Sequence, residues 1–543
     1  MKKLAIFSIL TICAFQICTA QSGSKMLSLT KVKVENGLLE GVKEASGIIS
    51  YKGIPFAAPP VGDLRWREPQ PAPNWTGVRK ADQFGAKAMQ LPIFGDMNFR
   101  APKTDEDCLY LNVWSPAKSA TDRLPVLVYF YGGGFLAGDG SEPRYDGENM
   151  AKKGIITLTV NYRLGIFGFF SHPELTVESQ VHSSGNYGYL DQNAALKWVQ
   201  KNIAAFGGDP NKVTIAGESA GSASVSAQMI SPLSKGLFRA AIGESGSVLG
   251  TLPPSPIKVE EQKGSEYAKS IHANTLKDLR NIPANELLQL TGKPGTPRFS
   301  STMDGYFFTE TPIETFKKGL QSKVPLLAGW NSAEIPYNGV LGSQSLTLEN
   351  YTKAVQNLYG NKAVDALKVY QAKSDQDVEK VATDLASDRF IAFSTWKWMD
   401  MHLKTGNQPV YRYIYSRPMP LMTAEMGNAT PGLAGGIIKN DKNVPKPKPA
   451  IGARHACEIE YAMGNLASNK AYTFTADDYK VSATMLNYFA NFIKTLNPNG
   501  KGLPVWSALK TTDAKVMIID VKSQQVPEPN RSRYLFQDQF FNK

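Results

Sequence analysis

A serine flanked by two glycines is the feature of this sequence best suited to chemistry. The pattern Gly217-Glu218-Ser219-Ala220-Gly221 follows the apolar run 213–216 and precedes a stretch compatible with a helix. Glycines at these positions allow a cramped strand-to-helix turn that lifts the serine Oγ out of a sheet. The pattern alone is only moderately specific, but its place between a strand and a helix is the arrangement that such a nucleophile needs. The sequence therefore predicts Ser219 as the nucleophile of an acyl-transfer reaction.

A serine hydroxyl is a weak nucleophile, so an imidazole must accept its proton. The histidines that follow Ser219 are His272, His402 and His455. The chain between Ser219 and His272 is too short for a further strand and an acid-bearing loop, and His402 lies in a helix-like segment rich in Trp and Met. His455 follows a Gly- and Pro-rich approach that reads as a loop. We predict His455 as the general base.

An acid must orient this imidazole, and backbone N–H groups must stabilise the oxyanion of the intermediate. Glu334 follows the apolar run 326–329 in a predicted loop, and in this architecture the acid lies between nucleophile and histidine in the chain. Gly132-Gly133-Gly134 follows another apolar run, and its N–H groups are not obstructed by side chains. Ala220 would contribute a further donor at a helix start. The pattern predicts Glu334 as the acid and these amides as the oxyanion hole.

Strands alternate with helices along much of the chain, as expected of elements that must hold these groups. Apolar runs typical of strands buried on both faces lie at 126–130, 155–160, 213–216, 240–242, 326–328 and 410–414. A helix is predicted over 191–205, with Asp191 at its start and Gly207-Gly208 at its end. Alternating apolar residues around Asn36-Gly37 predict an antiparallel hairpin within 29–51. The fold class is α/β, with a mainly parallel sheet.

The walls of a substrate pocket are harder to predict. Segment 427–449 is rich in Gly, Pro and Lys and should be irregular. It could be a lid or rim over a pocket, but the reading as a plain surface loop is preferred. Segments 297–308 and 396–401 are further candidates for pocket walls.

Composition excludes several other classes of protein. The chain has 543 residues, 42% of them hydrophobic, with 46 Gly and 34 Pro, which describes a globular protein rather than a disordered or repetitive one. Its formal net charge of +12 comes from basic residues spread along the chain. Because no nucleic-acid motif focuses this charge, we expect no nucleic-acid partner. No metal or organic cofactor is implied, since the chain itself supplies nucleophile, base and donors.

The N-terminus is typical of an export signal. Residues 1–20 combine Lys2 and Lys3, a short apolar run, and small residues before a cleavage site after Ala20. The run is too short to span a membrane, and no later stretch reaches the required length. We expect residues 21–543 to be one exported domain, secreted or periplasmic, of unknown oligomeric state. Its remaining cysteines, Cys108 and Cys457, are predicted to be free and buried.

Together these motifs resemble those of the type-B carboxylesterases, in the cholinesterase and carboxylesterase superfamily. The stretches that carry the resemblance are 52–62 (KGIPFAAPPVG), 106–112 (EDCLYLN), 131–135 (YGGGF), 161–165 (NYRLG), 206–210 (FGGDP), 217–221 (GESAG) and 452–465 around His455. The resemblance covers nearly the whole of 21–543. It implies the α/β-hydrolase fold, a large and mostly parallel central sheet flanked by helices after an N-terminal antiparallel hairpin.

The resemblance also implies functions for individual residues. Ser219, Glu334 and His455 would form the catalytic triad, and Gly133, Gly134 and Ala220 the oxyanion hole. Glu218 would line the floor of the pocket and Ser245 would support the triad. The pairs Arg65–Glu106 and Arg163–Asp191 would be structural ion pairs. For Glu218, Ser245 and the two ion pairs, ordinary polar packing in the core is an equally good interpretation.

The sequence departs from the family pattern in two places, one at a disulfide position and one at a choline-binding position. The family usually bridges the cysteine of its Glu-Asp-Cys motif to one about twenty residues earlier, where this sequence has Ala88. The stretch between Gln90 and Asp107 also lacks the tryptophan that stacks on choline in cholinesterases. We expect an exported serine carboxylesterase acting on a small ester. The alternatives are a catalytically silent adhesion protein of the same fold, or a lipase or amidase with the same triad.

Overall fold

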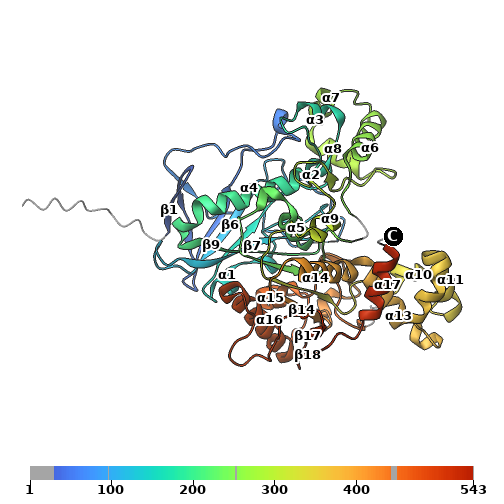
Figure 1. Cartoon of the computed structure of the whole chain (residues 1–543). Coiled ribbons are helices and arrows are strands. Elements are labelled where there is room, and N and C mark those ends of the chain that lie inside the picture. The colour runs from blue at the N-terminus through green and yellow to red at the C-terminus, as the bar shows by residue number, and fades with distance from the viewer. Residues whose placement is uncertain (1–29, 96, 251–252, 442–448, 542–543) are drawn as a thin grey trace, which may run out of the picture.

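A computed structural model describes residues 30–95, 97–250, 253–441 and 449–541 (Figure 1). The predicted signal peptide, residues 1–20, lies outside the described residues. Among the helices that are described, none is both long enough and apolar enough to cross a membrane.

The centre of the molecule is one sheet of eleven strands. In spatial order these are β18 (Gln524–Pro527), β17 (Lys515–Ile519), β14 (Val410–Tyr415), β13 (Leu326–Asn331), β10 (Ala240–Glu244), β9 (Gly208–Glu218), β7 (Leu124–Phe130), β8 (Ile156–Val160), β6 (Tyr110–Ser115), β4 (Ile49–Pro55) and β3 (Val42–Lys43). Neighbours from β17 to β8 are parallel, and the strands at both ends pair antiparallel. This arrangement confirms the predicted α/β class and mainly parallel sheet. The prediction was possible because parallel strands buried on both faces have continuous apolar sequences.

The predicted N-terminal hairpin is also confirmed. β1 (Lys31–Val34) pairs antiparallel with β2 (Gly37–Glu40), and β5 (Val78–Lys80) extends this small sheet. Two short pairs lie elsewhere, β11 (Ser255–Pro256) with β12 (Thr302–Met303) and β15 (Thr430–Pro431) with β16 (Ile437–Ile438).

Helices cover both faces of the central sheet. Figure 1 shows α4 (Tyr187–Asn202) and α5 (Ala220–Ile230) on one side, and α1 (Glu148–Ala151), α15 (Ile459–Met463) and α16 (Ala476–Thr495) on the other. α5 packs on β9 and β10, and α14 (Phe393–Thr405) packs on β13 and β14. These contacts place the ends of the strands next to the starts of the helices that follow them.

The predicted start of the first long helix is wrong. α4 begins at Tyr187, so Asp191 lies inside the helix and does not cap it. Its carboxylate is fully buried and accepts hydrogen bonds from Arg163 Nε and Nη2, both 2.8 Å long. A buried acid held by an arginine and an acid at a helix start look alike in sequence. At the other end, a short 3-10 turn stops at Gly207, whose φ of 84° ends the helix as predicted.

A second group of helices packs around a separate apolar cluster beside the sheet. It comprises α10 (Asn338–Leu341), α11 (Leu348–Tyr359), α12 (Ala363–Val369) and α13 (Asp375–Ser387). The C-terminal helix α17 (Arg531–Phe541) joins this group and also packs on α14 (Figure 1). The remaining helices are α2 (Gly165–Phe169), α3 (Pro173–Glu178), α6 (Ile257–Ser270), α7 (Leu276–Asn281), α8 (Ala284–Thr291) and α9 (Pro312–Lys317).

Both cysteines of the described chain are free and buried, as predicted. Burial raises the pKa of each thiol well above its usual value. Cys108 and Ala88 line the same small cavity, so the two positions lie close together although the second has no thiol. The ion pairs Arg65–Glu106 and Arg163–Asp191 are both present, at 2.6 and 2.8 Å.

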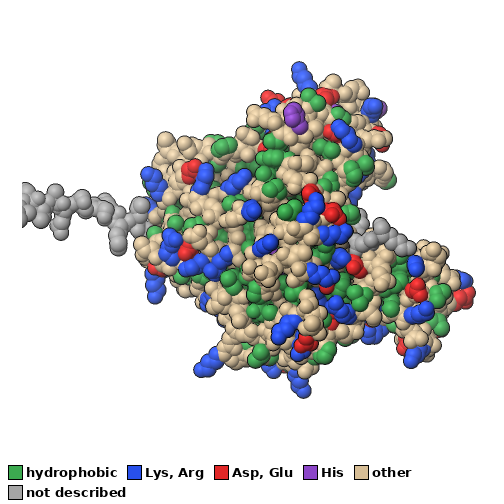
Figure 2. Space-filling model, in the orientation of Figure 1, with side chains coloured by type: hydrophobic (Ala, Val, Ile, Leu, Met, Phe, Trp, Pro, Cys, Tyr) green, Lys and Arg blue, Asp and Glu red, His purple; other side chains and the backbone are tan. Residues whose placement is uncertain are grey.

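Positive charge is dispersed over the face seen in Figure 2. Figure 2 shows Lys and Arg side chains scattered over the visible face among acidic and hydrophobic ones. Among the described residues, several Lys side chains pair with nearby acids, as Lys353 does with Glu349 and Lys380 with Asp384.

Candidate active site

Ser219 lies at the turn between β9 and α5, in a backbone conformation that few residues other than glycine adopt. Its φ and ψ are 55° and −117°. A Cβ added to Gly217 would collide with the backbone of Gly221, and one added to Gly221 would overlap the carbonyl oxygen of Phe130. Both glycines are therefore needed for the turn to fit against β7. The turn leaves Ser219 half-buried, with its Oγ free to reach across the end of the sheet.

The structure brings Ser219, His455 and Glu334 into one hydrogen-bonded row. Nε2 of His455 lies 2.8 Å from the Oγ of Ser219, and Nδ1 lies 2.7 Å from Oε2 of Glu334. The backbone N–H of His455 also donates to the carbonyl of Glu334, at 2.9 Å. Glu334 lies in the loop after β13, next to β10 in the sheet. Acid and base are thus fixed to each other by side chain and by backbone.

The two other histidines after Ser219 lie elsewhere. His402 is fully buried in α14, where its Nε2 lies 2.8 Å from the carbonyl oxygen of Val324. Burial lowers the pKa of His402. His272 is exposed beyond the end of α6. Neither contacts the row formed by Ser219 and His455, as the sequence predicted.

Glu334 is held in place by neighbours of the row. Its Oε1 accepts a hydrogen bond from Ser245 Oγ and another from the backbone N–H of Asn331, both 2.7 Å long. Asn331 donates through its side chain to Glu458 and to the carbonyl of Arg454. The predicted supporting contact of Ser245 is present, whereas that of Asn331 had no signal in the sequence beyond its place at the end of a strand.

The glycine loop after β7 approaches the serine. A Cβ on Gly132 would meet Ser219 Cβ at 3.1 Å, which shows how close the two segments are. Gly133 and Gly134 have φ values of 104° and 64°. Ala220 is the first residue of α5, where backbone N–H groups lack partners within the helix. Donors from two segments can therefore converge near Ser219.

Glu218 places a second carboxylate beside the imidazole. Its Oε1 lies 3.3 Å from Nε2 of His455, and burial raises the pKa of Glu218 to about 7. For His455, burial alone would lower the pKa, but the carboxylates of Glu218 and Glu334 outweigh burial and the pKa lies above its usual value. Beside Glu218, at the paired position of strand β10, Glu244 is also fully buried, and burial raises its pKa to about 8. Glu244 accepts a hydrogen bond of 2.8 Å from Tyr129.

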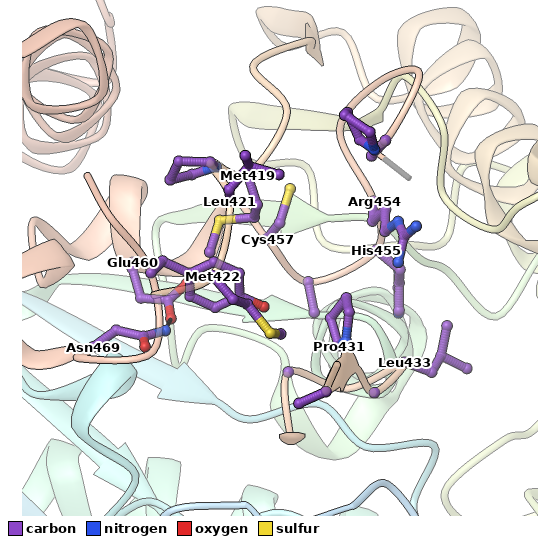
Figure 3. A pocket seen from close by; sticks show the side chains of 18 of the residues that line it. Met419, Leu421, Met422, Pro431, Leu433, Arg454, His455, Cys457, Glu460 and Asn469 are labelled. Carbon is purple, nitrogen blue, oxygen red and sulfur yellow. Dashed lines mark hydrogen bonds between the residues drawn. The ribbon is translucent and has the colours of Figure 1, made fainter. Parts of the chain in front are cut away.

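A cavity of about 330 Å³ opens beside His455 (Figure 3). Its apolar wall consists mainly of Met419, Leu421, Met422, Ala429, Pro431 and Leu433. Figure 3 shows Arg454 and His455 at one end of the cavity and Glu460 and Asn469 at the other. Neither Ser219 nor the glycine loop lines it, so the cavity lies on the histidine side of the row.

The interpretation of segment 427–449 as a plain surface loop is wrong for its described part. Several of its residues line this cavity, and the short pair β15–β16 gives the segment a defined shape. Its Gly- and Pro-rich composition did not distinguish a pocket wall from an ordinary loop.

The two other segments predicted as pocket walls lie in different places. From segment 297–308, Arg298 Nη2 donates to the carbonyl of Gly134, at 2.9 Å, so this segment contacts the glycine loop. Segment 396–401 lies inside α14, where Trp396, Trp398 and Met399 are fully buried. One neighbour of the site was missed altogether: the ring of Phe390 packs edge-on against His455, with centroids 5.0 Å apart. An apolar residue inside a helical segment gave no signal for this contact.

Comparison with known proteins identifies the family of this chain. The sequence matches the model described as "Carboxylesterase family" over residues 28–537. It is 31% identical over 526 residues to the para-nitrobenzyl esterase of Bacillus subtilis (strain 168), a match that covers 93% of this chain and 98% of that relative. It is 39% identical over 369 residues to the fumonisin B1 esterase of Sphingopyxis macrogoltabida, 65% of each chain, and so spans just under two thirds of that relative.

Solved structures lead to the same family. The Geobacillus stearothermophilus carboxylesterase EST55 superposes with a TM-score of 0.77 and 29% sequence identity, covering 94% of this chain and 100% of that one. A PNB esterase structure gives a TM-score of 0.76 at 28% identity. With its α/β-hydrolase fold, this chain therefore belongs to the carboxylesterase family and is a carboxylic ester hydrolase.

Proposed function

We propose that the protein is an exported serine carboxylesterase that hydrolyses small esters through an acyl-enzyme on Ser219. The observation that carries the proposal is the row of contacts from Ser219 Oγ through His455 to Glu334, at 2.8 and 2.7 Å. Export rests on the sequence of residues 1–20 alone.

In the first half of the reaction, the Oγ of Ser219 attacks the ester carbonyl carbon while its proton passes to Nε2 of His455. The carbonyl oxygen becomes an oxyanion, which accepts hydrogen bonds from the N–H groups of Gly133, Gly134 and Ala220. His455 then gives the proton to the leaving alkoxide as the ester C–O bond breaks. Glu334 keeps the imidazole oriented and stabilises its charged form.

In the second half, water repeats the sequence on the acyl-enzyme. His455 takes a proton from the water as its oxygen attacks the acyl carbon. The proton returns to Ser219 as the acyl–serine bond breaks, so the enzyme ends as it began and the products are an acid and an alcohol.

The cavity beside His455 is the proposed site of the alcohol portion. Because His455 must protonate the leaving oxygen, that oxygen and its substituent lie on the histidine side of the intermediate. The cavity borders His455 and Glu334 and is mostly apolar. A substrate with an apolar alcohol portion fits this arrangement, and the acyl portion would lie on the side of Arg298 and the glycine loop.

The proposal is tested with p-nitrophenyl esters from acetate to palmitate. We expect residues 21–543 to hydrolyse short chains, and Ser219→Ala to lose roughly 10⁴–10⁶-fold in kcat. Ser343→Ala, at an exposed serine, is the control and should retain full activity. Full turnover by folded Ser219→Ala would disprove the mechanism. A folded wild-type protein inactive on every ester would instead favour a binding protein or a different acyl group.

A further inference from the structure

A π-helical turn runs along the active site. This turn, η6 (Asp388–Ala392), links α13 to α14. Such turns are rare and frequently occur at functional sites. Here the turn leaves Phe390 half-buried, with its ring perpendicular to that of His455 at an interplanar angle of 83°. The base therefore has an aromatic neighbour in addition to its polar ones.

The same turn is tied to the loops that carry the acid and its support. Ser387, just before the turn, exchanges hydrogen bonds with the backbone of Ile335, at 3.3 and 3.4 Å, and Ile335 follows Glu334. Just after the turn, the carbonyl of Ser394 accepts a hydrogen bond from Ser247 Oγ at 2.7 Å. Phe390 of the turn thus contacts the base, and the residues that flank the turn contact two neighbouring loops.

The C-terminal helix α17 contacts this turn through an ion pair and through aromatic stacking beside it. Asp388, the first residue of the turn, is 2% exposed and accepts two hydrogen bonds from Arg533 of α17, at 2.7 and 2.9 Å. Tyr370 donates a third, at 2.8 Å. Phe541, near the end of α17, stacks on Phe393, with centroids 5.8 Å apart. A bidentate arginine pair fixes both distance and orientation, so α17 determines where the turn lies.

We propose that α17 is a positioning element for catalysis: through the Arg533–Asp388 pair it fixes the π-turn, and through Phe390 it holds the imidazole of His455 in line with Ser219. This inference rests on the proposed function. His455 is carried by a loop, and a proton must pass to and from its Nε2 in each half-reaction. A small rotation of the ring breaks that geometry, and misplacement by about 1 Å costs roughly 100-fold in rate. Phe390 is a positioning residue, because it acts through His455.

The first test changes the ring itself. Phe390→Ala should lower kcat for p-nitrophenyl acetate by about 10- to 100-fold, with KM within about threefold of the wild type. Labelling of Ser219 by a fluorophosphonate should slow by a similar factor, because that reaction needs His455 but no ester-binding pocket. Phe390→Tyr keeps the ring and should restore most of the rate. Wild-type kcat and labelling in Phe390→Ala would overturn the proposal.

The second test asks whether α17 acts through Phe390. Arg533→Lys keeps the charge but loses the two-pronged contact, and Arg533→Ala loses both; we expect roughly 3- and 10-fold lower kcat, respectively. In the Phe390→Ala background the same changes should alter kcat by less than about twofold, since the contact that they act on is already gone. Multiplicative losses in the double variants would overturn the proposal.

The control lies on the same helix. Among the described residues, Arg531 pairs with Glu528 at 3.0 Å and lies over the ring of Trp396 in α14, and it does not pair with Asp388. Arg531→Ala should keep wild-type kcat, whereas an equal loss there would show that α17 acts only through general stability. Circular dichroism at the assay temperature confirms that each variant is folded. Activity in Ser219→Ala would instead disprove the proposed function itself, so the two failures are distinct.

Discussion

Oε1 of Glu218 lies 3.3 Å from Nε2 of His455, the same ring nitrogen that contacts Ser219. The imidazole thus lies between two carboxylates, one at each nitrogen. Glu334 is the one that orients the ring, whereas Glu218 faces the nitrogen that must gain and lose the proton. The charge on Glu218 favours the protonated form of His455 and so affects the pH range in which the base is available.

Glu218→Gln is predicted to extend activity to lower pH. The Glu218 carboxylate raises the pKa of His455 against the effect of burial, so removing its charge should lower that pKa. The base must be neutral to accept the serine proton. The acid limb of kcat/KM should therefore move to lower pH, while kcat at the optimum falls because the imidazolium formed in the reaction is less stable. The pH profile with p-nitrophenyl acetate measures this shift. An acid limb that stays in place or moves to higher pH would contradict the prediction.

The glycine loop offers a matched pair of variants. A Cβ at Gly133 would overlap the carbonyl oxygen of Ala137, whereas at Gly134 the nearest atoms are 3.8 Å away. Both positions have positive φ. Gly133→Ala should displace the loop and lower kcat by about 100- to 1,000-fold, the usual effect of losing an oxyanion donor. Gly134→Ala bears only the backbone strain and should lose much less. Equal losses of kcat in the two variants would show that backbone strain at positive φ, and not displacement of the loop, moves the oxyanion donors.

Stability is predicted to fall with rising pH. Burial raises the pKa of Glu218 to about 7 and that of Glu244 to about 8, from an ordinary value of 4.5. Between pH 4.5 and about 8 the folded protein holds protons that the unfolded chain has released, so the free energy of unfolding decreases across this range. Glu244→Gln removes one of these protons and should flatten the dependence. Urea unfolding at several pH values measures the slope, with exposed Glu286→Gln as the control that should leave it unchanged.

A disulfide is predicted to form if a second cysteine is placed beside the buried thiol of Cys108. Cys108 and Ala88 line one small cavity, and the family resemblance places a bridge at these positions. Ala88→Cys should form it on oxidation and close a loop of about 20 residues, which is worth about 3 kcal/mol of stability. In a protein of residues 21–543 the free energy of unfolding should rise, dithiothreitol should abolish the gain, and a thiol count in denaturant should find only Cys457 reactive. A further pair of reactive thiols would show that the two positions are too far apart.

Local sequence patterns predicted the strands of the sheet well, but they predicted contacts between distant residues poorly. The strand runs were legible because strands buried on both faces need continuous apolar sequence. The local pattern misassigned Asp191 as a helix cap, because its partner Arg163 lies 28 residues away in sequence; only the family resemblance implied this pair. Segment 427–449 was misjudged for a similar reason: its composition predicts irregular structure, but only the tertiary contacts of its described part show that this part lines a cavity.

The sequence by itself determined the kinds of groups available and their order: a serine on a glycine turn, then an acid, then a histidine on a loop. These features are local, because a turn, a strand end and a loop each follow from a few adjacent residues. The tertiary structure decided which distant groups meet. His455 reaches Ser219 across 236 residues, and Glu218 and Phe390 approach the same ring from different elements. Such contacts depend on how the sheet orders its strands and how the C-terminal helix packs, and no spacing within the sequence records that packing.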